Sequence, residues 1–240
     1  MNRISKICVA ALAAGVAFSA SAKLKPGEES VGWSPIIIGI ATPVQMPWDF
    51  NWDVFGLDVN VAYADADKVG GLEVALGGSV ARTYMVGAQV AGLCSYADCN
   101  AYGLQVAVCD LCFQDFYGLQ ASAFTYSRSM YGLQANLLGA IAQDDVYGLR
   151  VSGLGSLNDG TTHGVEIAGL ANITREVEGV QLALGYNHAE KLHGCQVALV
   201  NYARTSSTSA FQIGLVNIIR DNVVPVLPLV NGCFFEADEN

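Results

Sequence analysis

Residues 103–107 read Gly-Leu-Gln-Val-Ala, and this stretch decides the fold because close copies of it recur along most of the 240-residue chain. Each copy has a glycine, an apolar residue, Gln or an acid, an aliphatic residue and a small residue. The copies begin at Gly56, Gly71, Gly87, Gly103, Gly118, Gly132, Gly148, Gly164, Gly179 and Gly194, and a last copy has Ala210 in the glycine position. These eleven copies lie 14 to 16 residues apart, which identifies an internal repeat.

Residues after each glycine alternate in character, as in a β-strand that has one packed face. We expect Leu104, Val106 and Val108 to face a dry core, and Gln105 and Ala107 to face the other way. A polar stretch follows each strand about seven residues later, which indicates a turn. The pattern predicts an all-β protein.

Two all-β architectures fit strands at this period. In a β-solenoid each copy is one coil, and equivalent residues stack about 4.8 Å apart on the next coil. In an antiparallel outer-membrane-type β-barrel each copy is one strand of a meander. A meander built from hairpins would make odd and even copies differ, and no such alternation occurs here. The repeat therefore favours a β-solenoid of about eleven coils of 14–16 residues, with the barrel as the alternative.

The chain divides into four segments. They are a signal peptide (1–22), an N-terminal segment and cap (23–53), a repeat domain (54–217), and a C-terminal cap and acidic tail (218–240). The signal peptide is indicated by Arg3 and Lys6, the apolar run 7–18 and the small residues 20–22. Caps are expected because the end coils of a solenoid would otherwise be open, and the prolines of residues 225–228 suit a sheet edge.

Stacked coils would bring equivalent polar residues into columns. The glutamine column comprises Gln89, Gln105, Gln120, Gln134, Gln181, Gln196 and Gln212. Its amides can hydrogen-bond along the coil axis, and the column is also a candidate binding ladder for a glycan or another surface. Arg150 and Glu166 interrupt it one coil apart, so we expect an exposed ion pair between them.

The residue before each glycine gives a second column, which holds Tyr102, Tyr117, Tyr131 and Tyr147. It continues with His163, Glu178 and His193, which are weak candidates for a divalent-metal site because imidazole and carboxylate groups bind such ions. A polar continuation of the aromatic column explains the same three residues. No cofactor is predicted.

Four cysteines lie close together in the sequence: Cys94, Cys99, Cys109 and Cys112. In an exported chain such cysteines are disulfide candidates, and zinc ligation is the alternative. Cys94 and Cys109 occupy nearly the same place in neighbouring copies, so one bridge could join two coils. Cys195 stands in the apolar column after the glycine and is expected in the core.

Gly-Leu-Gln-Val-Ala repeats that end in Phe211-Gln212-Ile213-Gly214-Leu215-Val216-Asn217 resemble a bacterial surface-repeat family first noted in spirochaetes. The flanking segments 52–57 and 225–231 resemble that family's flanks, so the likeness covers about residues 34–235. Cysteines, and Ala or Ser in place of many glycines, depart from the family pattern. The resemblance implies an exported protein of the cell envelope or surface.

Composition narrows the function. The net charge of −10 disfavours binding to nucleic acid, since phosphates repel an acidic surface. No nucleophile elbow or phosphate loop occurs, so we expect no enzyme. The sequence predicts a structural, adhesion or binding protein of the bacterial envelope, with an unknown protein, glycan or envelope component as partner. Membrane association stays open, and an outer-membrane barrel is the alternative function.

Overall fold

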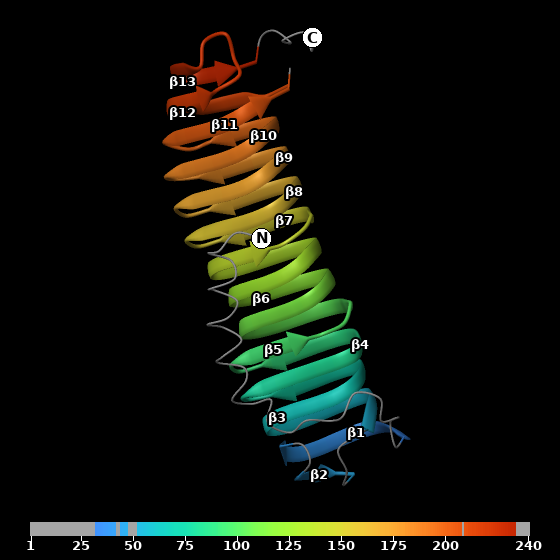
Figure 1. Cartoon of the computed structure of the whole chain (residues 1–240). Helices are drawn as coiled ribbons and strands as arrows, with labels where there is room; N and C mark the ends of the chain where they lie inside the picture. The colour runs from blue at the N-terminus through green and yellow to red at the C-terminus, as the bar shows by residue number, and fades with distance from the viewer. Residues whose placement is uncertain (1–31, 42–43, 48–51, 208, 234–240) are drawn as a thin grey trace. The chain divides into compact units, whose positions relative to one another are not determined.

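The computed structural model describes residues 32–41, 44–47, 52–207 and 209–233 (Figure 1). The chain is all-β, with 85% strand, and no helix occurs among the described residues. The strands are β1 (Gly32–Ala41), β2 (Val44–Met46), β3 (Trp52–Ala75), β4 (Gly78–Ala91), β5 (Cys94–Ala97), β6 (Ala101–Ala142), β7 (Val146–Ser152), β8 (Gly155–Ala168), β9 (Ala171–Ala183), β10 (Tyr186–Val197), β11 (Val200–Ser206), β12 (Phe211–Ile219) and β13 (Val226–Gly232). The predicted signal peptide and the acidic tail from residue 234 onward lie outside the described residues.

Successive copies of the repeat pair in parallel and in register. Gly148 of β7 pairs with Gly164 of β8, and Gly164 pairs with Gly179 of β9. Each copy is therefore one coil that lies on the equivalent residues of the next, as the neighbouring ribbons of β8, β9 and β10 show (Figure 1). The predicted β-solenoid of about eleven turns is confirmed. The barrel alternative is wrong, because a meander would make neighbouring copies antiparallel.

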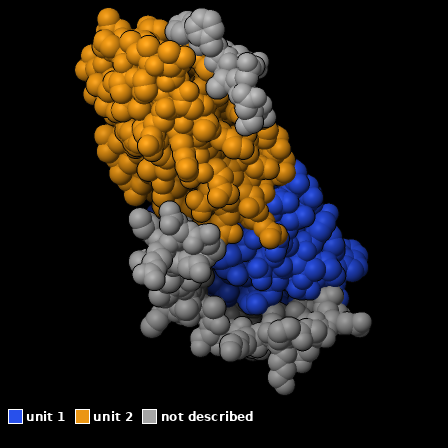
Figure 2. Space-filling model, turned by 45° about the horizontal axis from the view of Figure 1, so that its top comes forward, with its two compact units in different colours: residues 1–117 blue, residues 118–240 orange. Residues whose placement is uncertain are grey.

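The chain forms two compact units, residues 1–117 and 118–240 (Figure 2). The first contains β1 to β5 and the beginning of β6, and the second contains the rest of β6 and β7 to β13. The segments expected as caps contribute β1, β2 and β13. Pairing is parallel except for β2 on β1 and β13 on β12, which are antiparallel.

The repeated glycine is required by close contact between coils. Gly164 has a φ of +144°, which L side chains rarely adopt, and a Cβ built there would lie 2.1 Å from the carbonyl oxygen of Gly148. Only glycine avoids both penalties. Ala210, at the last copy, is not among the residues with positive φ.

The apolar core is narrow and comes largely from the residue two positions before each glycine. In the first unit this position holds Val69, Met85, Ala101 and Phe116, and in the second it holds Met130, Val146, Val177 and Leu192, all buried. These side chains fill one end of the coil. Much of the rest of the interior consists of buried Gln, Asn, Ser and Thr side chains together with alanines.

Candidate functional site

The glutamine column lies inside the solenoid. Gln105 and Gln196 are fully buried, as are the other members to within 2%. Four of its amides donate to the carbonyl oxygen of the amide one coil away: Gln105 to Gln89 at 2.9 Å, Gln134 to Gln120 at 2.7 Å, Gln196 to Gln181 at 2.9 Å and Gln212 to Gln196 at 2.8 Å. The predicted amide ladder is present, but its role as an external binding ladder is a wrong prediction, because no ligand in solvent reaches buried side chains.

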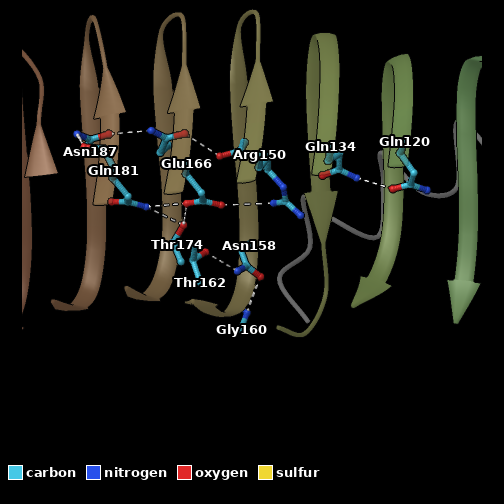
Figure 3. Close-up of polar contacts among 12 residues, drawn as sticks. Gln120, Gln134, Arg150, Asn158, Gly160, Thr162, Glu166, Thr174, Gln181 and Asn187 are labelled. Carbon is cyan, nitrogen blue, oxygen red and sulfur yellow. Dashed lines mark hydrogen bonds and ion pairs between the residues drawn. The ribbon is translucent and has the colours of Figure 1, made fainter. Parts of the chain in front are cut away.

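The ion pair between Arg150 and Glu166 is confirmed, with 3.5 Å between Arg150 Nη1 and Glu166 Oε1 (Figure 3). Its predicted exposure is wrong, since both side chains are fully buried. Glu166 Oε2 also accepts hydrogen bonds from Thr174 Oγ1 at 2.8 Å and Gln181 Nε2 at 2.9 Å. The pair thus replaces one link of the amide ladder.

A second buried ladder, of asparagines, was not predicted. It runs through β8 to β12, from Ser156 through Asn172, Asn187, Asn201 and Asn217, with side-chain hydrogen bonds of 2.8 to 3.1 Å. Its amides also donate to backbone carbonyls, for example Asn187 Nδ2 to Val197 O at 3.0 Å. Recurrence of Asn every 14 to 16 residues is the sequence signal that could have revealed it.

Buried carboxyl groups continue the polar interior in the first unit. Burial, and then the charge of Asp58, raises the pKa of Glu73 to about 8. Burial raises the pKa of Asp58 to about 7, and burial followed by the nearby Cys94 raises that of Asp110 to about 8. Burial therefore favours the neutral form of these carboxyl groups, and Glu73 and Asp110 are mostly protonated in the folded chain at neutral pH.

The apolar alternating residues face outward instead of into the core, which corrects the predicted orientation. Leu104 and Val106 are half-buried, Val108 is 54% exposed and Leu133 is 49% exposed. Cys195, expected in the core, is half-buried on the same face. Gln, Asn, Ser and Ala fill the interior of the coil, and the Gln, Asn and Ser side chains hydrogen-bond along the stack.

Exposed leucines stand at the bend between the two strands of successive coils. In the second unit they are Leu137, Leu154, Leu170, Leu184, Leu199 and Leu215, which are 50% to 75% exposed. This set is named the leucine corner below. Each turn from the one containing β6 residue Asn136 to β12 presents one of these leucines at the bend. They occupy two adjacent positions: Leu154 and Leu170 lie in register with Leu138, and the other four lie one residue earlier in the repeat, counted from its glycine position.

The column before the glycines is an aromatic ladder on the outer surface. Tyr131 and Tyr147 stack at 4.9 Å between ring centroids, and Tyr147 stacks on His163 at 4.4 Å. In the first unit, Tyr102 and Tyr117 stack at 4.8 Å.

The three metal-ligand candidates occupy adjacent coils but do not converge. His163 Nδ1 lies 2.8 Å from Glu178 Oε2, whereas His193 Nε2 lies 3.6 Å from Glu176 Oε1. Among the described residues no group of three potential ligands could hold a metal ion.

All six described cysteines are free thiols, so the structure forms no disulfide among them. Cys94 does pair with Cys109 in the neighbouring coil, and Cys112 pairs with Ala97. A hydrogen bond with Cys109 lowers the pKa of Cys94 to about 7, while burial raises that of Cys112 to about 12. The in-register position of Cys94 and Cys109 matches the predicted one, and the bridge itself stays a prediction.

Comparison with known proteins gives no match to a family model, to a curated protein or to a solved structure. No helix in the described part of the chain is long and apolar enough to cross a membrane. The described structure therefore offers an outer surface of repeated apolar and aromatic columns as the candidate functional site.

Proposed function

We propose that the chain is an exported, non-enzymatic repeat protein of the bacterial cell envelope, with a structural or binding role carried by its outer apolar surface. The observation that supports this most is the inversion of the coil, with polar side chains inside and Leu and Val outside. Polar groups that could act on a substrate, such as the Glu166 carboxylate, are occupied by internal ladders. The resemblance to the surface-repeat family, and the apolar run at residues 7–18, support export.

Export also bears on the cysteines. In neighbouring parallel strands the Cα atoms lie about 4.8 Å apart, within the roughly 4.4–6.8 Å span that a disulfide bridges. We propose that Cys94 and Cys109 form a disulfide in the oxidising compartment, since they are in register on adjacent coils. Such a bridge would join β5 to β6.

The test is to produce the full chain in a bacterial host and to measure the mass and location of the product. Export predicts loss of residues 1–22 and recovery in the envelope fraction, and Lys in place of both Ala20 and Ala22 should block processing. An unprocessed cytosolic product from the unaltered chain would contradict the proposal. Alkylation before and after reduction, followed by mass measurement, reports whether Cys94 and Cys109 are bridged.

A further inference from the structure

We propose that the leucine corner of the second unit inserts into the hydrocarbon edge of a lipid bilayer, so that the partner of this protein is a zwitterionic membrane surface. The proposal rests on the proposed function and names the envelope component that its apolar surface contacts. It is argued from four properties of the corner: its area, its satisfied backbone, its separation from charge and its repetitive chemistry.

The leucine corner is larger than an ordinary surface patch. Its exposed fractions range from 50% for Leu154 to 75% for Leu184. Six such side chains present on the order of 600 Å² of apolar surface, which is the upper end of the largest patch on a typical soluble monomer. The neighbouring outward columns extend it with side chains such as Leu133, Val151 and Ile213, each 38% to 49% exposed.

Backbone groups at the corner are satisfied between coils. Leu154 N donates to Leu138 O at 2.8 Å, and Leu170 N donates to Leu154 O at 2.7 Å. Leu199 N donates to Leu184 O at 3.3 Å. A segment in hydrocarbon must pair its backbone internally, because an unpaired N–H or C=O group there costs several kcal/mol. The stacked bends meet this condition, so the corner can leave water with its amides paired.

Charged side chains are segregated from the corner. In the second unit the exposed and half-buried charges fall in the stretch that follows the second strand of each coil: Arg128, Asp144, Asp145, Asp159, Arg175, Glu176, Glu178, Glu190, Lys191, Arg204, Arg220 and Asp221. Ion pairs join some of them across coils, such as Arg175 Nε to Glu190 Oε2 at 3.6 Å. Only Arg150 and Glu166 lie on the strand that leads to the corner, and both point inward. This division into an apolar side and a charged side is typical of elements that lie at a membrane interface.

The chemistry of the corner favours lipid over a protein partner. Every turn of the corner presents a leucine at the bend, at one of two adjacent positions of the repeat, so a protein surface would find no unique register along it. Fluid hydrocarbon requires neither register nor shape complementarity. The net charge of −10 opposes binding to anionic lipid heads, and the proposal is therefore specific for zwitterionic lipid.

The experiment is flotation of the purified full-chain product with vesicles of phosphatidylcholine. The test variant carries Leu170→Gln, Leu184→Gln and Leu199→Gln, and the matched control carries Arg175→Gln and Glu190→Gln, an exposed pair on the charged side that leaves the net charge unchanged. We expect the unaltered chain and the control to float equally, and the test variant to lose about a hundredfold in vesicle partition. Far-UV circular dichroism should show both variants folded, because the substituted side chains are exposed.

Four results would overturn the proposal. The unaltered chain could stay at the bottom of the gradient, or the leucine variant could float as well as the unaltered chain, which would assign binding to another segment. The unaltered chain could also sediment as a dimer that the leucine variant dissociates, which would make a second copy the occupant. Binding that appears only when anionic phosphatidylglycerol is added, and vanishes at high salt, would equally contradict it. Each leaves export and processing untouched, so failure of the lipid proposal is distinguishable from failure of the proposed function.

Discussion

The buried pair of Arg150 and Glu166 allows a quantitative test of how the interior is stabilised. Changing Glu166 to Gln leaves the Arg150 guanidinium buried without a counter-charge. Its Nε and Nη2 atoms already have no hydrogen-bond partner among the described residues. Removing one partner of a buried ion pair costs about 3–5 kcal/mol, because the remaining charge is uncompensated. We expect the single variants Glu166→Gln and Arg150→Gln to be destabilised by that amount.

The double variant should recover the loss. Glutamines one coil apart hydrogen-bond at 2.7 Å between Gln134 and Gln120 and at 2.9 Å between Gln196 and Gln181. An amide at position 166 keeps an acceptor for Gln181, and one at position 150 extends the column. Replacing a buried ion pair by a well-matched neutral pair is often neutral or stabilising. The double variant should therefore unfold at or above the denaturant midpoint of the unaltered chain.

Urea unfolding followed by circular dichroism at the strand band provides the measurement. With a slope of about 2–3 kcal/mol per molar urea, each single variant should lower the midpoint by roughly 1–2 M. The exposed pair removed by Arg175→Gln and Glu190→Gln is the control, and it should cost less than about 1 kcal/mol. A double variant that loses as much as both single variants together would refute the reasoning, since the charges would then be net stabilising.

Three further predictions address other parts of the interior. Glu73→Gln should flatten the pH dependence of the free energy of unfolding. The pKa of Glu73 near 8 in the folded chain lies above the unfolded value, so its contribution of a few kcal/mol is present below pH 4 and is lost as pH rises to 8, which unfolding midpoints between pH 4 and 9 would report. Gly164→Ala should cost more than about 3 kcal/mol because its Cβ would meet Gly148 O at 2.1 Å, whereas Gly139→Ala, with a nearest contact of 3.0 Å, should cost less in the same thermal unfolding assay. Asn187→Ala should lower the free energy of unfolding by about 1–3 kcal/mol, because it removes the donor to Gln181 O and Val197 O. Hydrogen exchange of the backbone amides in β9 to β11 should become faster, and unchanged exchange there would contradict a structural role for the ladder.

Sequence periodicity predicted the stacking but not which side of the strand faces inward. The regular return of Gly148, Gly164 and Gly179 favoured one coil per copy over the strands of a barrel, and from this the Arg150–Glu166 contact followed. Alternation shows that a strand has two different sides, but it does not show which side faces inward. The orientation was assigned by the general rule that apolar residues are buried. That rule fails here because the coil interior is narrow and its polar groups can pair along the stack, which removes the usual cost of burying them.

Comparison of the copies with one another indicates which side of the strand faces inward. The position after the glycine accepts Leu, Val, Ala, Cys and Phe, a range of volumes that a packed core would not tolerate. The next position is glutamine in seven copies, and Arg150 and Glu166, which replace it, are adjacent and opposite in charge. At a surface position, a charged residue in one copy does not need an opposite charge in the next copy. Copy-to-copy uniformity of the polar column, rather than hydrophobicity, was the signal for burial.

The same reasoning explains how the C-terminal end of the repeat is closed. An amide ladder needs a partner beyond its last member, since an unpaired buried polar group costs about 1–3 kcal/mol. At the end of the asparagine ladder, Asn217 Nδ2 donates to Leu227 O of β13 at 3.4 Å, and Asn231 Nδ2 donates to Asn217 O at 3.4 Å. Strand β13 therefore hydrogen-bonds to polar groups of the last coil, in addition to covering its apolar groups. In a solenoid whose interior is held by ladders, a cap must end the ladders, and this requirement accounts for the asparagine within the otherwise apolar strand β13.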